Sequence, residues 1–216
     1  MDLPDPLVGP RVGWYVRSGN GVTARKLPGS ATLEDLLALP DEARGFEVID
    51  GEIVQKDAAC GKHGGAQVRI SRFLGPFDRR PGGRTPGGWI LGTEVHVFFD
   101  AHNTLVPDVA GWRRERLAEL PAEVPVRVIP DWTCEVLSTN QRNDLVKKKR
   151  VYHQHRVQNY WIVDPKQETL AVYRWSLEGY TEVLTTERGE RVRAEPFEAI
   201  ELLVGVLFGE DEEELP

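Results

Sequence analysis

The chain has 216 residues, of which 40% are hydrophobic. This length and apolar content suit one globular domain with a buried core, and no apolar run is long enough to span a bilayer. The formal net charge of -7 argues against a general electrostatic affinity for nucleic acid. A local basic face remains compatible with it, because cationic side chains cluster around Arg79-Arg80, Arg113-Arg114 and Lys147-Arg150.

The two ends of the chain are expected to lie outside the folded domain. Residues 1–30 are rich in Gly and Pro without a clean period, which predicts an irregular arm. They show neither the basic nor the apolar region of a signal peptide, so we expect a cytoplasmic protein. Residues 210–216 form an acidic, solvated tail, and residues 31–209 form the domain. Cys60 and Cys134 match no zinc or redox spacing, so we expect reduced thiols, with Cys134 in the core.

The first predicted elements are two helices and a hairpin. A helix begins after Thr32, which can cap it, and stops at Pro40. The Asp50-Gly51 pair lies between two apolar, β-branched runs and predicts a hairpin over residues 46–54, because both central residues of such a turn must tolerate positive φ. A second helix runs from His63 to Leu74, and residues 79–88 form a Gly, Pro and Arg loop.

The rest of the chain reads mainly as strands. Alternation and apolar runs predict strands over 89–99, 104–109, 132–137 and 159–163, then a hairpin of 169–175 with 180–186. The run at 132–137 is apolar enough to lie centrally in a sheet. A long helix is expected over 143–155, and residues 197–208 close the body as a strand-like run plus a short apolar turn. The order predicts a mixed α/β domain with one central sheet.

Acidic residues interrupt three of the apolar strands. They are Glu47, Asp108 and Glu135. A carboxylate in the interior of a sheet is costly unless another charge offsets it. Three such residues in separate strands indicate a shared cation, since hard divalent ions take carboxylate oxygens as ligands. Each also has a simpler interpretation: Asp108 as the start of a turn, Glu135 as an edge-strand charge, and Glu47 as an exposed cross-strand charge.

The helix after Glu135 carries three polar side chains along one face. Asp144, Lys148 and Tyr152 are spaced four and four. This face can bring Lys148 over the end of the strand that carries Glu135, where a lysine can orient or deprotonate a water or stabilise charge on a phosphate. The alternatives are a solvated charge run for Lys148 and simple packing for Tyr152.

Three histidine and acidic positions are ambiguous in the same way. His63 can touch a metal or a phosphate, or it can be a polar residue at a helix start. Glu94 and His96 alternate on one predicted strand, and they either face the same site or lie at the surface.

The ordered set of these pieces resembles the Uma-type restriction endonuclease family of the PD-(D/E)XK nuclease superfamily. The resemblance runs from about Thr32 to Phe208. No single piece is specific, whereas the set at these spacings is. The matching segments are residues 32–40, 46–52, 62–63, 106–109, 134–138, the trio Asp144, Lys148 and Tyr152, residues 159–165 and residues 196–200.

The resemblance implies a restriction-endonuclease-like α/β core, in which a central mixed sheet is flanked by helices. It implies that Asp108 and Glu135, with Glu47 as an additional acid, bind Mg²⁺ or Mn²⁺, and that the catalytic set includes Lys148 and Tyr152. The reaction would be hydrolysis of a phosphodiester in DNA. One departure stands out: the motif puts its lysine two residues after Glu135, where this chain has Leu137, and the resemblance implies that Lys148 on the helix takes its place.

Two other readings stay open. The first is a catalytically inactive nuclease-fold protein that binds nucleic acid or a protein partner. The second is an oligomeric structural protein whose carboxylates bind a structural cation. If the chain cuts both strands of DNA it needs two sites, which favours a symmetric homodimer or a higher homo-oligomer.

Overall fold

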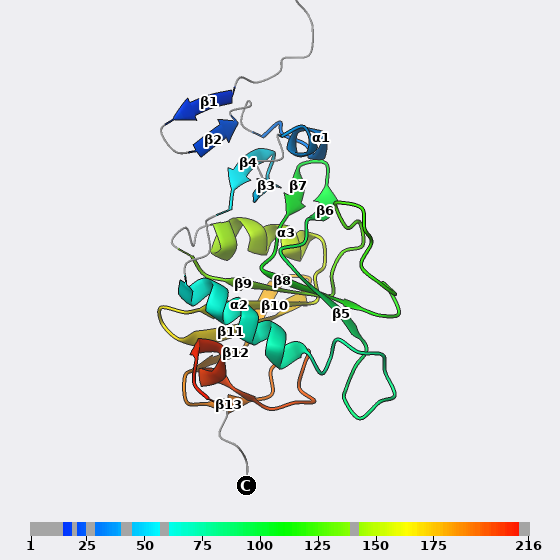
Figure 1. Cartoon of the computed structure of the whole chain (residues 1–216), viewed down its shortest axis with the longest axis vertical. Helices are drawn as coiled ribbons and strands as arrows, with labels where there is room; N and C mark the ends of the chain where they lie inside the picture. The colour runs from blue at the N-terminus through cyan, green and yellow to red at the C-terminus, as the bar shows by residue number, and fades with distance from the viewer. Residues whose placement is uncertain are drawn as a thin grey trace, which may run out of the picture.

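A computed structural model describes residues 15–18, 21–24, 29–39, 45–56, 61–138 and 143–211. Its centre is a six-stranded sheet of order β12-β11-β10-β9-β8-β5, in which β9 and β10 are parallel and the other pairs are antiparallel (Figure 1). The strands are β5 (Trp89–Thr93), β8 (Val109–Arg113), β9 (Trp132–Val136), β10 (Asn159–Asp164), β11 (Thr169–Ser176) and β12 (Gly179–Glu187). The predicted mixed α/β fold with 132–137 inside the sheet is therefore confirmed.

A second sheet of four strands lies beside the first and has the order β4-β3-β7-β6 (Figure 1). Its strands are β3 (Phe46–Ile49), β4 (Glu52–Gln55), β6 (Val97–Asp100) and β7 (Asn103–Leu105). The predicted hairpin is β3 with β4, and both turn residues have positive φ, 52° for Asp50 and 70° for Gly51. The predicted central mixed sheet is the six-stranded one, and the four-stranded sheet is a further sheet that the sequence did not predict.

Two predicted strands are each split where the chain crosses between the sheets. The run 89–99 becomes β5 and β6, with the break at Glu94, whose φ is 56°. The run 104–109 becomes β7 and β8, with the break at 106–108. Pro107 has no N–H to continue a ladder, and Asp108 therefore lies between two strands instead of inside one.

Five helices of different kinds lie in the described residues: α1 (Leu33–Leu37), α2 (Gly61–Leu74), the π-helix η2 (Asn143–Lys148), α3 (Lys149–Gln154) and the 3₁₀ helix η3 (Val204–Phe208). Thr32 is the N-cap of α1, as predicted, and Asp35 Oδ2 accepts the Thr32 N–H at 2.9 Å. Pro40 lies outside the described residues. The long helix expected over 143–155 consists of η2 followed by α3, so the first half of this helix is a π-helix and the second half is an α-helix. No described helix has both the length and the apolar character needed to cross a membrane.

Short paired strands complete the fold. β1 (Tyr15–Ser18) pairs with β2 (Gly21–Ala24), so the arm that the sequence predicted to be irregular contains regular structure. β13 (Arg191–Val192) pairs with β14 (Leu202–Leu203) near η3, which makes the predicted run at 197–208 mostly turn, a short strand and a helical turn.

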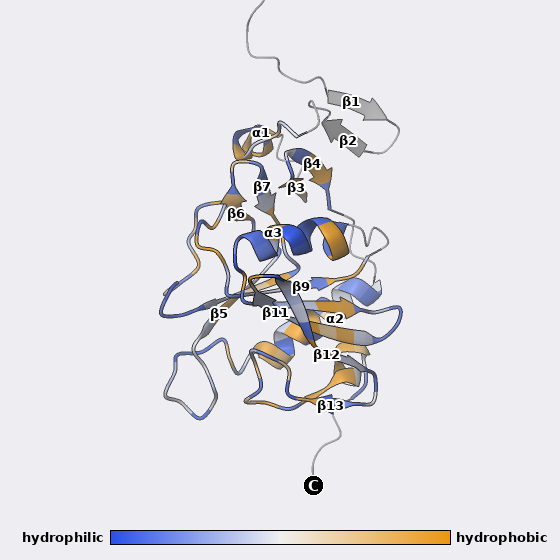
Figure 2. Cartoon of the chain, turned by 180° about the vertical axis from the view of Figure 1, so that it is seen from behind, coloured by the Kyte–Doolittle hydropathy of each residue, from blue (hydrophilic) through white to orange (hydrophobic). Residues whose placement is uncertain are grey.

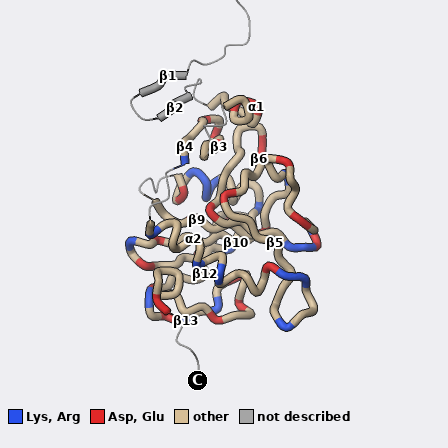
Figure 3. The backbone as a smooth tube through the Cα atoms, viewed as in Figure 1, with Lys and Arg blue, Asp and Glu red and all other residues tan. Residues whose placement is uncertain are grey.

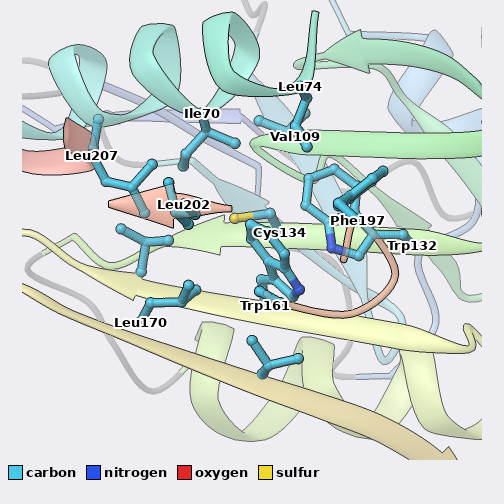
Figure 4. Packing of buried hydrophobic residues seen from close by; sticks show 14 of the residues in the cluster. Ile70, Leu74, Val109, Trp132, Cys134, Trp161, Leu170, Phe197, Leu202 and Leu207 are labelled. Atoms are coloured by element: carbon cyan, nitrogen blue, oxygen red, sulfur yellow. The ribbon is translucent and has the colours of Figure 1, made fainter. Parts of the chain in front are cut away.

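The core has one apolar cluster on each face of the six-stranded sheet. On the face covered by α2, Ile70 and Leu74 of the helix point toward Val109 and Cys134 of the sheet (Figure 4). Phe197 completes this cluster; its ring centroid lies 4.9 to 5.6 Å from those of Phe77, Trp89, Trp132 and Trp161. The burial of Cys134 confirms the prediction for that residue, while Cys60 lies outside the described residues.

The opposite face carries α3, whose residues are mostly hydrophilic (Figure 2). Only Val151 and Tyr152 of α3 are buried, and they join the second apolar cluster with residues of β6, β8 and β10. The functional candidates lie on this side of the sheet, between the end of β9, the four-stranded sheet and η2.

Candidate active site

A narrow cavity of about 20 Å³ opens beside the end of β9. That volume holds about one water molecule or one small ion. We call its titratable lining the acid pocket, and it consists of Glu47, Lys56, His63, Asp108, Glu135, Asp144 and Lys148. Segments far apart in the sequence supply these residues, from β3 to η2, so the fold assembles the pocket from both sheets and two helices.

Asp108 joins the start of β8 to the end of β9. Its Oδ2 accepts the N–H of Val136 at 2.6 Å, and its Oδ1 lies 2.7 Å from Lys56 Nζ and 3.2 Å from His63 Nε2. Burial by itself would raise the pKa of Asp108, but the hydrogen bond from His63 and the charges of Lys56 and Lys148 outweigh it, so this pKa lies well below its usual range. Asp108 is therefore a buried carboxylate that stays ionised.

Glu135 projects from β9 toward α3. Its Oε1 accepts the hydroxyl of Tyr152 at 2.5 Å, and its Oε2 lies 3.2 Å from Lys148 Nζ. The side chain is 1% exposed. Complete burial raises the pKa of Glu135 well above its ordinary value, although Lys148 opposes this shift. The edge-strand reading of Glu135 is wrong, because β9 lies between β8 and β10.

Glu47 reaches the pocket from the other sheet. It lies in β3 and is 2% exposed, so the reading as an exposed cross-strand charge is wrong. Its Oε2 accepts the N–H of Val106 at 3.0 Å and lies 3.3 Å from Lys148 Nζ. Val106 lies between β7 and β8, so its N–H is not used in a strand pairing and can donate to Glu47. The Val106 carbonyl accepts hydrogen bonds from Lys56 Nζ at 3.0 Å and from Lys148 Nζ at 3.4 Å. The break that the sequence did not predict thus helps to build the pocket.

Lys148 is the buried cation at the centre of the pocket and is 1% exposed. Besides Glu47 and Glu135, its Nζ lies 3.5 Å from Asp144 Oδ1. Burial would lower the pKa of Lys148, but the surrounding carboxylates outweigh burial and raise this pKa well above its ordinary value. Burial also raises the pKa of Asp144, to about 6. The structure therefore brings Glu47, Asp108, Glu135, Lys148 and Tyr152 into one connected network.

Two residues were missed by the sequence reasoning: Lys56 in the acid pocket and Gln67 beside it. Lys56, next to β4, has Nζ 2.6 Å from Glu94 Oε2 as well as 2.7 Å from Asp108 Oδ1. Gln67 on α2 donates to Glu94 Oε1 at 2.9 Å and to the Asp108 carbonyl at 2.8 Å. A signal existed for both: Lys56 follows by two the residue that pairs with Glu47, and Gln67 follows His63 by four.

The structure assigns different surroundings to the three ambiguous residues His63, Glu94 and His96. His63 is 4% exposed and hydrogen-bonded to Asp108, which raises the pKa of its ring, and its Nδ1 has no hydrogen-bond partner among the described residues. Glu94 borders the pocket, whereas His96 Nε2 lies 3.1 Å from the Phe46 carbonyl and takes no part in it. Ligand atoms of His63, Glu94 and Asp108 all lie within 4.8 Å of one another.

The donor set of the acid pocket fits a hard divalent cation. Its lining has four carboxyl groups (Glu47, Asp108, Glu135 and Asp144) against two ammonium groups (Lys56 and Lys148) and the imidazole of His63. When all the carboxyl groups are ionised, the negative charges outnumber the positive ones even with His63 protonated. Carboxylate oxygens are the ligands that Mg²⁺ and Mn²⁺ prefer, and His63, whose Nδ1 is buried without a partner among the described residues, adds an imidazole to the lining.

Comparisons with known proteins show the family and the fold to which this chain is similar. A crystal structure described as a putative nuclease belonging to DUF820 from Anabaena variabilis is 26% identical to this chain and superposes with a TM-score of 0.62. The match covers 82% of this chain and 97% of that one. No curated protein matches the sequence. The sequence model of the Uma2 family, described as "Putative restriction endonuclease", matches residues 33–205. With more than half of its length matched and the nuclease-like fold in place, the chain belongs to the Uma2 family.

Proposed function

We propose that this protein is a metal-dependent endonuclease that hydrolyses phosphodiester bonds in DNA with Mg²⁺ or Mn²⁺. One observation carries the proposal: Glu47, Asp108 and Glu135, from separate segments of the chain, line a single buried pocket with Lys148. Burying four carboxyl groups together is costly, and a divalent cation that binds them offsets this cost.

In this proposal Asp108, Glu135 and Glu47 hold the metal, with His63 beside Asp108. The bound metal would polarise the phosphate and lower the pKa of an attacking water. Tyr152 orients Glu135 through its hydroxyl, and Asp144 positions Lys148. Because the pKa of Lys148 is raised, its ammonium stays protonated and stabilises negative charge developing on the phosphate; it does not abstract a proton.

The displaced lysine is compatible with this role. The motif position after Glu135 is Leu137, yet the η2 turn brings Lys148 Nζ to 3.2 Å from Glu135 Oε2. Only the final position of the ammonium matters for its electrostatic effect, so the proximity supports Lys148 as the motif lysine.

An acidic nuclease also needs a basic surface for its polyanionic substrate. Four exposed arginines at the end of α2 and in the loop to β5 line a shallow hollow. They are Arg72, Arg79, Arg80 and Arg84. Figure 3 marks Lys and Arg positions in blue along the backbone of the chain. We assign this Arg loop to the DNA backbone, since guanidinium groups bind phosphates in bidentate geometry.

Nicking of supercoiled plasmid in Mg²⁺ or Mn²⁺ tests the proposal. We compare wild type with Asp108→Asn, which keeps the shape of the side chain, with Lys148→Ala, and with Lys147→Gln as a control outside the pocket. Asp108→Asn should abolish metal-dependent nicking, Lys148→Ala should lower the rate at least about 100-fold, and Lys147→Gln should match wild type. Equal nicking by every sample, or by none while DNA still binds, would overturn the catalytic proposal.

The second outcome corresponds to the rival reading, an inactive nuclease-fold protein that binds nucleic acid or a protein partner. One observation favours it: Asp108 Oδ1, the oxygen not occupied by the main chain, already contacts the ammonium of Lys56. The cytoplasmic location and the dimer stay predictions as well, and the dimer is checked by light scattering with and without DNA.

A further inference from the structure

Lys56 is the one cation of the acid pocket to which the proposed reaction gives no part. Its Nζ lies 2.7 Å from Asp108 Oδ1, 2.6 Å from Glu94 Oε2 and 3.0 Å from the Val106 carbonyl. We propose that Lys56 is a tethered counter-cation that holds Asp108 in the metal-free protein and competes with the divalent ion for Oδ1. The inference rests on the proposed function, because it assumes that Asp108 is a metal ligand.

The competition follows from the way Asp108 is held. Its Oδ2 is engaged by the Val136 N–H at 2.6 Å, so Oδ1 is the oxygen that the main chain leaves for a cation. Oδ1 already has two partners, Lys56 Nζ and His63 Nε2. A carboxylate oxygen has two lone pairs, and both are thereby used. A metal ion that binds Oδ1 must therefore replace one of these partners.

Charge selects Lys56 as the partner that leaves. A small divalent ion sits about 2.1 Å from a ligand oxygen. Lys56 Nζ is only 2.7 Å from that same oxygen, so the two cations would share one ligand oxygen at short range. Two positive charges at such a distance repel each other strongly when little water lies between them. His63 can release its proton when a metal binds, and the neutral imidazole has no such repulsion and is itself a common metal ligand.

Lys56 is also the pocket lysine that can move. Its side chain is 13% exposed against 1% for Lys148, which is held by three carboxylates. The Lys56 main chain is anchored by its N–H, which donates to the Gly45 carbonyl at 2.7 Å, so a shift of Nζ involves the flexible stem alone. Gln67 holds Glu94 independently at 2.9 Å, which keeps that carboxylate in place when Nζ leaves Asp108.

Mn²⁺ binding at one fixed pH, measured by isothermal titration and by electron paramagnetic resonance, tests the inference without relying on activity. Lys56→Gln should bind Mn²⁺ about tenfold more tightly than wild type, because the competing charge is gone. Lys147→Gln removes the same charge from a Lys–Glu52 pair outside the cavity, so it should change affinity less than about twofold. Lys56→Arg keeps the cation and should not bind more tightly than wild type.

Two further samples keep the test decisive. If Lys56→Gln folds poorly by circular dichroism, Lys56→Met replaces it, with the same expected gain. In wild-type crystals soaked with Mn²⁺, the anomalous peak should lie beside Asp108 Oδ1, with Lys56 Nζ moved beyond hydrogen-bond distance from it. A Mn²⁺ peak at Oδ1 with Nζ still at its present distance would overturn the inference.

The outcomes also separate this inference from the proposed function. If Asp108→Asn abolishes Mn²⁺ binding while Lys56→Gln binds no more tightly than wild type, Lys56 organises the ligands instead of competing for them, and the inference alone fails. If Asp108→Asn binds Mn²⁺ as well as wild type does, Asp108 is not a ligand, and the proposed function and the inference fail together.

Discussion

The two faces of strand β9 contain equally buried residues with opposite chemistry. Trp132, Cys134 and Val136 face the cluster under α2, whereas Glu135 faces Lys148 and Tyr152 on the other side. All residues of β9 are buried, so burial does not distinguish the faces. On one face, loss of water is offset by contact between hydrocarbon groups; on the other, it is offset by hydrogen bonds and ion pairs.

This contrast has a measurable consequence. Removing a side chain from the apolar face should reduce stability by the same amount at every pH, because no charge is involved. Removing one from the acid pocket should have an effect that depends on pH and on metal. Four variants test or refine that difference, from the largest expected change in stability to the smallest.

Phe197→Ala should lower the free energy of unfolding by about 4 kcal/mol. Phe197 is fully buried among one phenylalanine and three tryptophan rings, so the variant leaves a large apolar cavity. Urea unfolding at pH 5, 6.5 and 8 measures the loss, which should be equal at each pH. A loss that changes by more than about 1 kcal/mol across this range, a large share of total stability, would mean that the two faces are coupled.

Asp144→Asn should make the metal-free protein more stable above pH 7, by about 3 kcal/mol. The pKa of Asp144 is about 6 in the folded state and 3.8 ordinarily. Between pH 3.8 and about pH 6 the folded state therefore binds more protons than the unfolded state, so the stability of the folded state falls as the pH rises through this range. The variant lacks this penalty, so its advantage should vanish below pH 4. Urea unfolding in a chelating buffer checks this, and an advantage that persists at pH 4 would contradict the assignment.

Tyr152→Phe should cost about 1.5 kcal/mol, because it leaves the buried Glu135 Oε1 without its donor. Plasmid nicking should also fall by about 10- to 100-fold, since the carboxylate loses the group that orients it. Tyr180→Phe removes a hydroxyl from the same aromatic cluster, where it donates to the Val157 carbonyl, and serves as the control for activity. If both variants nick alike, Tyr152 has only a packing role.

Replacing Arg79, Arg80 and Arg84 together by Gln should change stability by less than about 0.5 kcal/mol, since all three are exposed. DNA binding should weaken, and the slope of log affinity against log salt should become shallower by about 2 to 3, close to 0.9 for each phosphate that an arginine no longer neutralises. A triple Gln variant of Arg188, Arg191 and Arg193 has the same charge change elsewhere. Equal slopes for the two variants would remove the Arg loop from the DNA interface.

Local patterns predicted the single elements well. The Asp50-Gly51 turn defines its hairpin through the backbone requirement of the turn itself. The spacing of Asp144, Lys148 and Tyr152 placed all three toward Glu135, because side chains four apart share a helical face even though the first turn is a π-helix. The candidate acids Glu47, Asp108 and Glu135 were found as carboxylates inside apolar runs, and the ordered motifs of the family then supported the same set.

Features that depend on how the sheets cross were not predictable in this way. The alternation over 89–99 continues through Glu94 because both β5 and β6 are half-buried, so the period does not reveal that the chain changes sheets. Lys56 follows an exposed strand residue, and only the register of β3 with β4 and the position of Asp108 make it a pocket residue. The positions of Glu94 and Lys56 depend on contacts between segments that are distant in the sequence, so a local pattern does not reveal them.

The parallel pairing of β9 with β10 links the pocket to the folding of the whole domain. The chain between these strands contains η2 and α3, and therefore carries Asp144, Lys148 and Tyr152. Parallel strands need such a crossover, and their long-range contacts form late and slowly. We therefore expect the acid pocket to form together with the middle of the sheet, because the crossover that joins the two parallel strands carries its charged groups.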